Sequence, residues 1–220
     1  MNPNSIFQQK PQAIFFDFDG VILESSDIKT LAFVELFNHL SEEHQQAIHD
    51  YHVNNMGISR FKKFDWIYSK LLGKVITEAE SKKLGEGFTN LVYQKILDAP
   101  FVPGAEKLLN WVQENTINFV ASGTPQDELR KIVKARNLDQ YFKGVFGTPA
   151  SKVDIVNAQI EKYNLDSSKC WFIGDASSDY KAAMETGLNF IARNTADFTD
   201  FWKEKDNIII VEDLSEVLPA

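Results

Sequence analysis

The chain has 220 residues, of which 44% are hydrophobic and 25% are charged, the balance of an ordinary globular protein. Its 23 lysines and arginines against 31 aspartates and glutamates leave a net charge of −8, which argues against nucleic acid or an anionic membrane surface as the main partner. The single cysteine, Cys170, excludes an internal disulfide framework and fits a reducing compartment.

Signals for a membrane or an export route are also missing from the sequence. No apolar run approaches the roughly 18 residues of a membrane span, and the apolar segment 208–211 has the length of a strand. The first five residues carry neither a basic nor an apolar region, so no signal peptide is expected. We therefore expect a soluble, cytoplasmic protein. The sequence leaves the oligomeric state open, and a monomer is compatible with it.

Short apolar runs alternate with amphipathic helical segments through much of the chain. The run Ala13-Ile14-Phe15-Phe16 is typical of a strand that is buried on both faces, and five similar runs follow it. This alternation predicts an α/β fold with a doubly wound parallel sheet. The expected strands are 13–16, 118–121, 144–146, 170–173, 189–192 and 208–211, and the expected helices around them are 104–115, 125–137, 151–164 and 178–186.

Residues 21–97 interrupt this alternation with a block that has no strand pattern. The last helix of the block begins with a capping-box sequence, in which Thr77 caps the helix and Glu80 reaches back. A patterned block of this length is too long for a loop. We therefore predict an inserted all-helical domain at 21–97 and an α/β core made of 1–20 and 98–220. The amphipathic stretches of the block are 27–40, 42–54, 59–72 and 77–96.

Two aspartates follow directly after the first predicted strand. Residues two apart on extended backbone point to the same side, so Asp17 and Asp19 both face the crevice beyond the carboxyl end of that strand. Open α/β sheets bind their ligands in this crevice. Two adjacent carboxylates repel each other, and Mg²⁺ can offset their charge because it binds one or two carboxylates together with water and phosphate oxygens.

Three further groups of polar residues occupy similar places. Ser122-Gly123-Thr124 follows the second predicted strand and offers a hydroxyl and backbone N–H groups to an anionic oxygen. Lys152 begins a predicted helix and carries a point charge that suits a phosphate. The turn after the fourth predicted strand supplies two more carboxylates, Asp175 and Asp179.

Each of these groups alone also has a purely structural explanation. An aspartate at a strand end is often a turn or cap residue, a serine before glycine is usually part of a turn, and a lysine that begins a helix is usually solvated. All four groups, however, lie just beyond successive predicted strands, and a parallel sheet brings those ends together. Together they predict a site for a metal-bound phosphate.

The same residues, in this order, resemble the four motifs of the haloacid dehalogenase superfamily. The motifs are Asp17-Phe18-Asp19-Gly20-Val21, then Ser122, then Lys152, then the segment 174–179. The helical insert resembles the superfamily's first cap type, as in phosphoglycolate phosphatases and β-phosphoglucomutases. The resemblance covers nearly the whole chain and implies a Rossmann-like catalytic core with a mobile helical cap.

The resemblance implies a Mg²⁺-dependent phosphatase that acts on a small phosphorylated metabolite, a phosphomonoester. In such an enzyme Asp17 is the nucleophile that forms an aspartyl-phosphate, and Asp19 is first the general acid and then the base that activates water. The implied groups that bind the phosphoryl oxygens are Ser122, Gly123 and Lys152. The implied ligands of Mg²⁺ are Asp17, the main-chain carbonyl of Asp19, Asp175 and Asp179.

Two other functions stay open at this point. A sugar-phosphate mutase of the β-phosphoglucomutase type would retain the phosphoryl group, and a non-catalytic relative would only bind a phosphorylated ligand. Lys29 stands where the mutases typically carry a hinge histidine, which favours a hydrolase, and Glu24-Ser25 replaces the Asp-Ser of many relatives. Both Asp17 and Asp19 are present, which disfavours a non-catalytic protein.

Cap residues are expected to select the substrate, which the sequence does not identify. Arg60 is a candidate contact for a polar or anionic leaving group, and a solvated cation at a helix start is the alternative. Lys62 and Lys63 are expected at the surface. His49 and His52 have an i, i+3 spacing that a zinc site can use, but no further ligand joins them, so we do not expect zinc.

Overall fold

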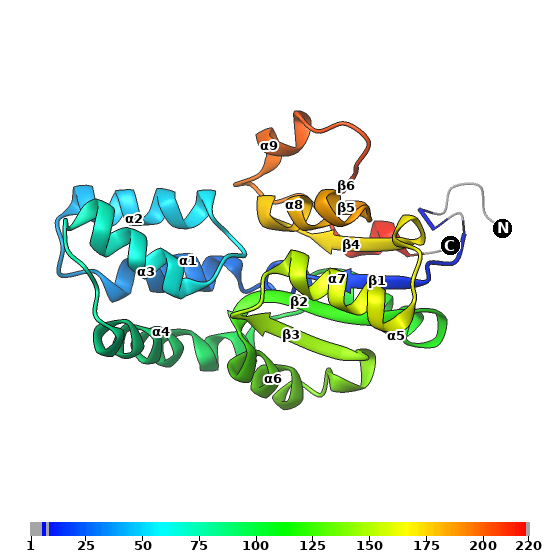
Figure 1. Cartoon of the computed structure of the whole chain (residues 1–220), viewed down its shortest axis with the longest axis horizontal. Helices are drawn as coiled ribbons and strands as arrows, with labels where there is room; N and C mark the ends of the chain where they lie inside the picture. The colour runs from blue at the N-terminus through cyan, green and yellow to red at the C-terminus, as the bar shows by residue number, and fades with distance from the viewer. Residues whose placement is uncertain (1–5, 8, 219–220) are drawn as a thin grey trace.

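In the computed structural model, which describes residues 6–7 and 9–218, six strands form one fully parallel sheet (Figure 1). The strand order is β3-β2-β1-β4-β5-β6, so the chain winds outwards from the central β1 in one direction and then in the other. This is the predicted doubly wound α/β fold. The strands are β1 (Ala13–Phe16), β2 (Ile117–Pro125), β3 (Gly144–Thr148), β4 (Cys170–Gly174), β5 (Asn189–Arg193) and β6 (Ile209–Val211).

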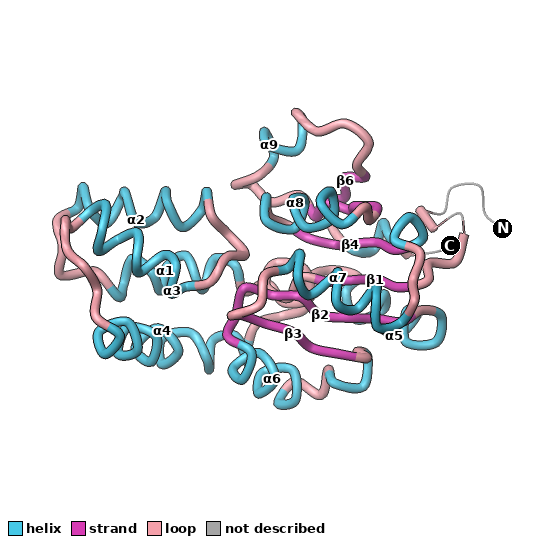
Figure 2. Tube along the Cα trace, viewed as in Figure 1, coloured by secondary structure: helices cyan, strands magenta, loops and turns pink. Residues whose placement is uncertain are grey.

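Helices cover both faces of the sheet, as Figure 2 shows. Side chains of β1 alternate between the two faces: Ile14 and Phe16 pack with α5 and α6, whereas Ala13 and Phe15 pack with α7 and α8. All four side chains are fully buried, which explains the continuous apolar run in the sequence. The covering helices are α5 (Ala105–Asn115), α6 (Gln126–Ala135), α7 (Lys152–Tyr163) and α8 (Ser177–Thr186).

The helical insert lies between β1 and α5 and forms a bundle beside the sheet, at the left of Figure 1. Its first helix packs against the second and the fourth, and a single turn of π-helix at Ile67–Leu71 continues the third. We call this bundle the cap. Its helices are α1 (Ser26–Leu36), α2 (Glu42–Asn54), α3 (Arg60–Trp66) and α4 (Glu78–Asp98).

The end of β2 differs from its prediction in a way that affects the site. The strand was expected to stop at residue 121, but it continues to Pro125, and its pairing with β3 shifts register between Ala121 and Pro125. Ser122-Gly123-Thr124 therefore belongs to an irregular strand end and not to a loop. Pro125 precedes α6 and is not its first residue. The shift occurs where the backbone bends away from regular pairing.

Other differences concern short elements and ends. Helix α1 ends at Leu36, although the sequence predicted that the helix would continue to residue 40. The five-residue helix α9 (Thr199–Lys203) was not predicted, because so short a segment shows no helical periodicity. The expectation about a signal peptide concerns residues 1–5, which lie outside the described residues. None of the described helices is long and apolar enough to cross a membrane.

The predicted capping box at the start of α4 is present, and it yields a stability prediction. The Thr77 hydroxyl accepts from the Glu80 N–H at 3.2 Å, and the Glu80 carboxylate accepts from the Thr77 N–H at 2.8 Å. Thr77→Ala should lower the free energy of unfolding by about 1 kcal/mol, because it leaves an N-terminal N–H of α4 without its partner. Chemical denaturation measures this change. Thr77→Ser keeps the hydroxyl and serves as the control; equal losses in both variants would contradict the explanation.

Candidate active site

The polar residues from the four separate segments meet at the carboxyl ends of β1, β2 and β4. Three of these segments line a small cavity of about 60 Å³ between the core and the cap, and Lys152, from the remaining segment, lies beside Asp17. The core contributes Asp17, Asp19, Ser122, Gly123 and Asp175 to its walls. The carboxyl ends of these parallel strands thus lie at one edge of the sheet, as the sequence predicted.

Asp17 sits at the centre of this arrangement because β1 carries it there. Its backbone N–H donates to the carbonyl of Ile173 at 2.9 Å, which extends the pairing between β1 and β4 by one step. One carboxylate oxygen, Oδ2, lies 3.1 Å from the Lys152 ammonium. The other oxygen, Oδ1, is buried and has no hydrogen-bond partner in the structure. Buried polar atoms normally have a partner, so Oδ1 is available to a ligand.

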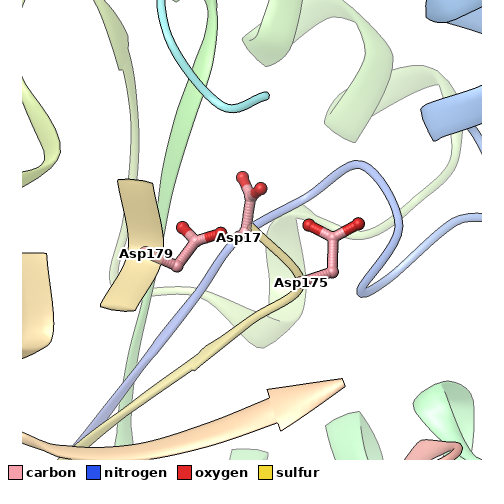
Figure 3. Close-up of side chains that lie close together, drawn as sticks. All are labelled: Asp17, Asp175 and Asp179. Carbon is pink, nitrogen blue, oxygen red and sulfur yellow. The ribbon is translucent and has the colours of Figure 1, made fainter. Parts of the chain in front are cut away.

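Three carboxylates gather at this point, as Figure 3 shows. Among the residues that the structure describes, Asp17, Asp175 and Asp179 form a group whose ligand atoms all lie within 4.8 Å of one another. Asp179 accepts from the Lys152 ammonium at 2.5 Å and from the Ala176 N–H at 3.1 Å. All three carboxylates are almost completely buried. The predicted nucleophile and two predicted metal ligands thus share one small volume.

This crowding of buried negative charge changes the protonation of the acids. Burial raises the pKa of Asp17 to about 7; Lys152 opposes the shift, whereas the charges of Asp179 and Asp19 add to it. Burial and the neighbouring charges of Asp17 and Asp179 also raise the pKa of Asp175 well above its ordinary value. Although burial disfavours the Lys152 ammonium, the carboxylates of Asp17 and Asp179 raise its pKa. A single ammonium therefore does not offset the cluster.

Two glycines allow the acids to come this close. Gly20 has a positive φ of 75°, and a Cβ placed on it would lie 2.0 Å from Oδ2 of Asp175. A Cβ on Gly174 would lie 2.2 Å from the Cβ of Asp179. Any larger residue at either position would push the carboxylates apart. The glycines of the first and fourth motifs are therefore requirements of the cluster.

The donor set suits a hard divalent cation. Three carboxylates lie within reach of one point, one of their oxygens has no partner, and burial raises the pKa of all three carboxyls. Mg²⁺ prefers oxygen ligands and retains positions for water and phosphate oxygens. In contrast, His52 faces Lys63 and His49 lies beside Asp50, so these histidines form no common site. The residues present fit magnesium and not zinc.

Asp19 has different partners from those of Asp17, and two of the three come from the start of the cap. Ser25 donates to its Oδ1 at 2.7 Å, Lys29 forms an ion pair with its Oδ2, and Thr124 donates to Oδ2 at 3.2 Å. Burial alone would raise the pKa of Asp19, but the Lys29 ammonium and these hydrogen bonds hold it below its ordinary value. The surroundings of Asp19 thus favour its carboxylate form, whereas those of Asp17 bring its pKa close to neutral pH.

A loop of the cap covers the end of β2. A Cβ placed on Gly123 would lie 2.4 Å from the carbonyl oxygen of Gly57, and a Cβ on Gly57 would lie 2.9 Å from the Lys152 Nζ. Ser122 is buried below this loop, and its hydroxyl accepts from the Thr124 N–H at 3.1 Å. The cap thus contacts the core directly over the predicted phosphate-binding residues.

A profile of the haloacid dehalogenase-like hydrolase family matches residues 11–187, which include all of these core residues. The chain belongs to this family. The structure brings Asp17, Asp19, Ser122 and Asp175 to one cavity and places Lys152 3.1 Å from Asp17, and the roles of these residues stay predictions. No curated protein matches the chain.

Solved structures of this hydrolase family share the fold of the whole chain. A β-phosphoglucomutase from Clostridium difficile matches with a TM-score of 0.73 and 18% identity, over 94% of this chain and 93% of that one. A predicted phosphoglycolate phosphatase from Haemophilus somnus matches with a TM-score of 0.70 and 18% identity, over 96% of this chain and 97% of that one. The hydrolase YfnB from Bacillus subtilis, bound to magnesium, matches with a TM-score of 0.67 and 18% identity, over 95% of this chain and 97% of that one. At these identities the likeness concerns the fold.

Arg60 connects the cap of this hydrolase to its core. Its guanidinium donates two hydrogen bonds to Glu128 of α6, at 2.6 and 3.0 Å, and a third to Thr89 of α4 at 2.9 Å. It also lies 4.5 Å above the ring of Phe88. The alternative that Arg60 is a solvated helix-start cation is wrong, because only 5% of the residue is exposed. Arg60 also lines the cavity, so its predicted contact with a leaving group stays a prediction.

Lys63 was expected at the surface, and this expectation is wrong. The residue is 3% exposed, and its ammonium lies 3.0 Å from Nδ1 of His52 and 5.2 Å from the ring of Phe33. Both Lys63 and His52 line the cavity. One feature of the sequence is consistent with this burial: His52 and Phe33 belong to apolar faces of their helices. Lys63 itself is one of two adjacent lysines between Phe61 and Phe64, and nothing in that pair shows which lysine is buried.

The buried histidine predicts a pH-dependent stability. Burial, and then the charges of Lys63, Lys29 and His49, lower the pKa of His52 to about 2. The folded protein keeps this imidazole neutral, whereas the unfolded chain protonates it below about pH 6.5, so stability falls as the pH falls. Between pH 7 and pH 5 this linkage removes about 2 kcal/mol of unfolding free energy.

Denaturant unfolding at both pH values checks this expectation. His52→Gln should lose less stability than the wild type over the same interval, since glutamine does not titrate. His39→Gln is the control, because His39 is exposed. An unchanged pH dependence in His52→Gln would show that His52 is protonated in the folded protein.

Proposed function

We propose that the protein is a Mg²⁺-dependent phosphatase that hydrolyses a small phosphomonoester through an aspartyl-phosphate at Asp17. The observation that carries this proposal is the position of the Asp17 carboxylate. It lies at a cavity between the Lys152 ammonium and Asp19, with one oxygen free of any partner. A nucleophile, a phosphate-binding cation and an acid/base group in one enclosed place are the requirements of phosphoryl transfer.

In the first step an oxygen of Asp17 attacks the phosphorus, and the ester P–O bond breaks. Asp19, carrying the proton that it took from water in the preceding turnover, gives this proton to the departing alkoxide. In the second step Asp19 takes a proton from a water molecule whose oxygen attacks the phosphorus of the aspartyl-phosphate. Inorganic phosphate leaves, and the Asp17 carboxylate is regenerated. The ion pair with Lys29 favours the carboxylate form of Asp19, which suits the second step.

The surrounding residues offset the charge of the phosphoryl group. The ammonium of Lys152, the hydroxyl of Ser122 and the backbone of Gly123 provide donors for its oxygens. Asp17, Asp175 and Asp179, with the main-chain carbonyl of Asp19, would hold Mg²⁺, which neutralises charge on the nucleophile and on the phosphate when bound. The magnesium in the Bacillus subtilis relative supports this assignment.

The cap completes the proposed site. The cavity of about 60 Å³ holds only a few water molecules, so the cap, residues 21–97, must move away from the core to admit a substrate and close again to exclude water. In this proposal the loop at Gly57 covers the phosphoryl group and Arg60 lines the leaving-group end. A mutase would use the same core, and only the fate of the phosphoryl group distinguishes the two reactions.

Asp17→Asn should abolish phosphate release, because an amide is not a nucleophile toward phosphorus and cannot form the acyl phosphate. The expected loss is roughly a thousandfold or more in kcat/KM across a panel of sugar phosphates, phosphoglycolate and nucleoside monophosphates. The measurement is a time course of inorganic phosphate. Asp206→Asn, at an exposed position in a loop, is the matched control. Hydrolysis at the wild-type rate by Asp17→Asn would remove Asp17 from its role, and an isomerised phosphate ester would favour the mutase.

Removal of divalent cations should stop phosphate release, and Mg²⁺ should restore it. Without a cation the three buried carboxylates repel one another and the phosphate. Asp175→Asn weakens this donor set, so it should raise the Mg²⁺ concentration needed for half-maximal activity about tenfold or more. Full activity in chelator-treated buffer without added metal would contradict the magnesium assignment.

A further inference from the structure

Lys63 places a buried ammonium at the cavity, and the proposed reaction assigns no role to this group. Lys63 lies on α3, lines the same cavity as Asp17, and is 3% exposed. Its hydrogen-bond partners are Nδ1 of His52 at 3.0 Å and the carbonyl oxygen of His52 at 3.4 Å. Among the described residues no carboxylate lies within ion-pair distance of it. An ammonium has three donors, so at least one is left for another partner.

The charges around the cap end of the cavity do not balance. Lys29 is paired with Asp19, and Arg60 is paired with Glu128. His52 is neutral, since its pKa is lowered to about 2, and so it gives Lys63 an acceptor but no negative charge. The positive charge that remains is that of Lys63.

A buried charge without a counter-charge is costly, and folded proteins seldom keep one unless it is used. Burial, and then the charges of Lys29 and Arg60, lower the pKa of Lys63 well below its ordinary value. An anion beside this ammonium would reverse that effect. Lys63 belongs to the cap and lines the same cavity as the core carboxylates Asp17 and Asp175, so its ammonium is available to the part of a substrate that lies against the cap.

We propose that Lys63 forms a subsite for a second anionic group, a carboxylate or a phosphate, on the leaving part of the substrate. The inference rests on the proposed function for the identity of the first group, the phosphoryl group that is transferred to Asp17. The substrate class is then a small phosphomonoester with a second negative charge. Neutral sugar monophosphates and simple alkyl phosphates fall outside this class.

Matched pairs of esters test the subsite. In the carboxylate arm, 2-phosphoglycolate is compared with 2-hydroxyethyl phosphate, which has the same length and a neutral end. In the phosphate arm, 1,3-propanediol bisphosphate is compared with 3-hydroxypropyl phosphate. A charge-assisted contact at Lys63 predicts a preference for the anionic member of about 10- to 100-fold in at least one arm. The arm with the larger preference identifies the group that binds.

Lys63→Met removes the charge and should reduce this preference to about one. Lys63→Gln, which keeps a donor without the charge, should also lose it and serves if the methionine variant does not fold. Lys62→Met is the matched control: it removes the same charge from an exposed neighbouring position and should keep the wild-type preference. A residue with only a structural role would lower the Tm when substituted and leave the preference unchanged, whereas loss of an unpaired buried charge should not lower the Tm.

Two readouts keep the subsite separate from the proposed function. The ratio of Kd values is measured by calorimetry in the Asp17→Asn background, where turnover does not interfere, and the ratio of kcat/KM is measured by phosphate release in the active protein. Equal Kd values within both pairs, or a preference that survives Lys63→Met, would overturn the subsite while hydrolysis stands. Absence of phosphate release from every ester, with a Kd preference that depends on Lys63, would overturn the phosphatase and leave the subsite.

Discussion

The electrostatic repulsion among the buried carboxylates of Asp17, Asp175 and Asp179 is the constraint around which the site is built. Their ligand atoms lie within 4.8 Å of one another, and Lys152 is the cation that contacts two of them. Burial makes each charge more expensive, so the pKa of each acid is raised. Further positive charge at this point would offset the repulsion and favour the carboxylate form of Asp17.

The cap takes part in the same electrostatics. Lys29 of α1 is paired with Asp19 of the core, and Arg60 of α3 is paired with Glu128 of α6. Both contacts join residues from different parts of the fold and both are largely buried, so movement of the cap must break two ion pairs as well as apolar packing. Against the effect of burial, Lys29 and the hydrogen bonds at Asp19 lower its pKa, so the cap also favours the charged form of a core carboxylate.

Burial of these charged side chains lowers the stability of the fold, but their ion pairs fix the positions of the side chains in the site. Replacement of buried ion pairs by apolar residues often leaves a protein equally stable or more stable. Elsewhere the chain follows ordinary rules: β1 is apolar throughout, α4 has its capping box, and the two faces of the sheet hold separate apolar clusters. Several of the exceptions, Asp17 and Lys63 among them, line a single cavity, and departures from these rules are expected at functional sites.

The sequence alone predicted the strands, apart from the end of β2, and the helical insert, because burial on both faces and helical periodicity are local properties. It predicted Asp17, Asp19, Ser122 and Lys152 without any knowledge of their distances. Only the tertiary structure decided that Arg60 binds Glu128, 68 residues away, and that Lys63 is buried beside His52. Those contacts depend on how the cap packs against the core and on how its helices pack against one another. The sequence pattern of a single helix does not show which residue of another element its charged side chains will contact.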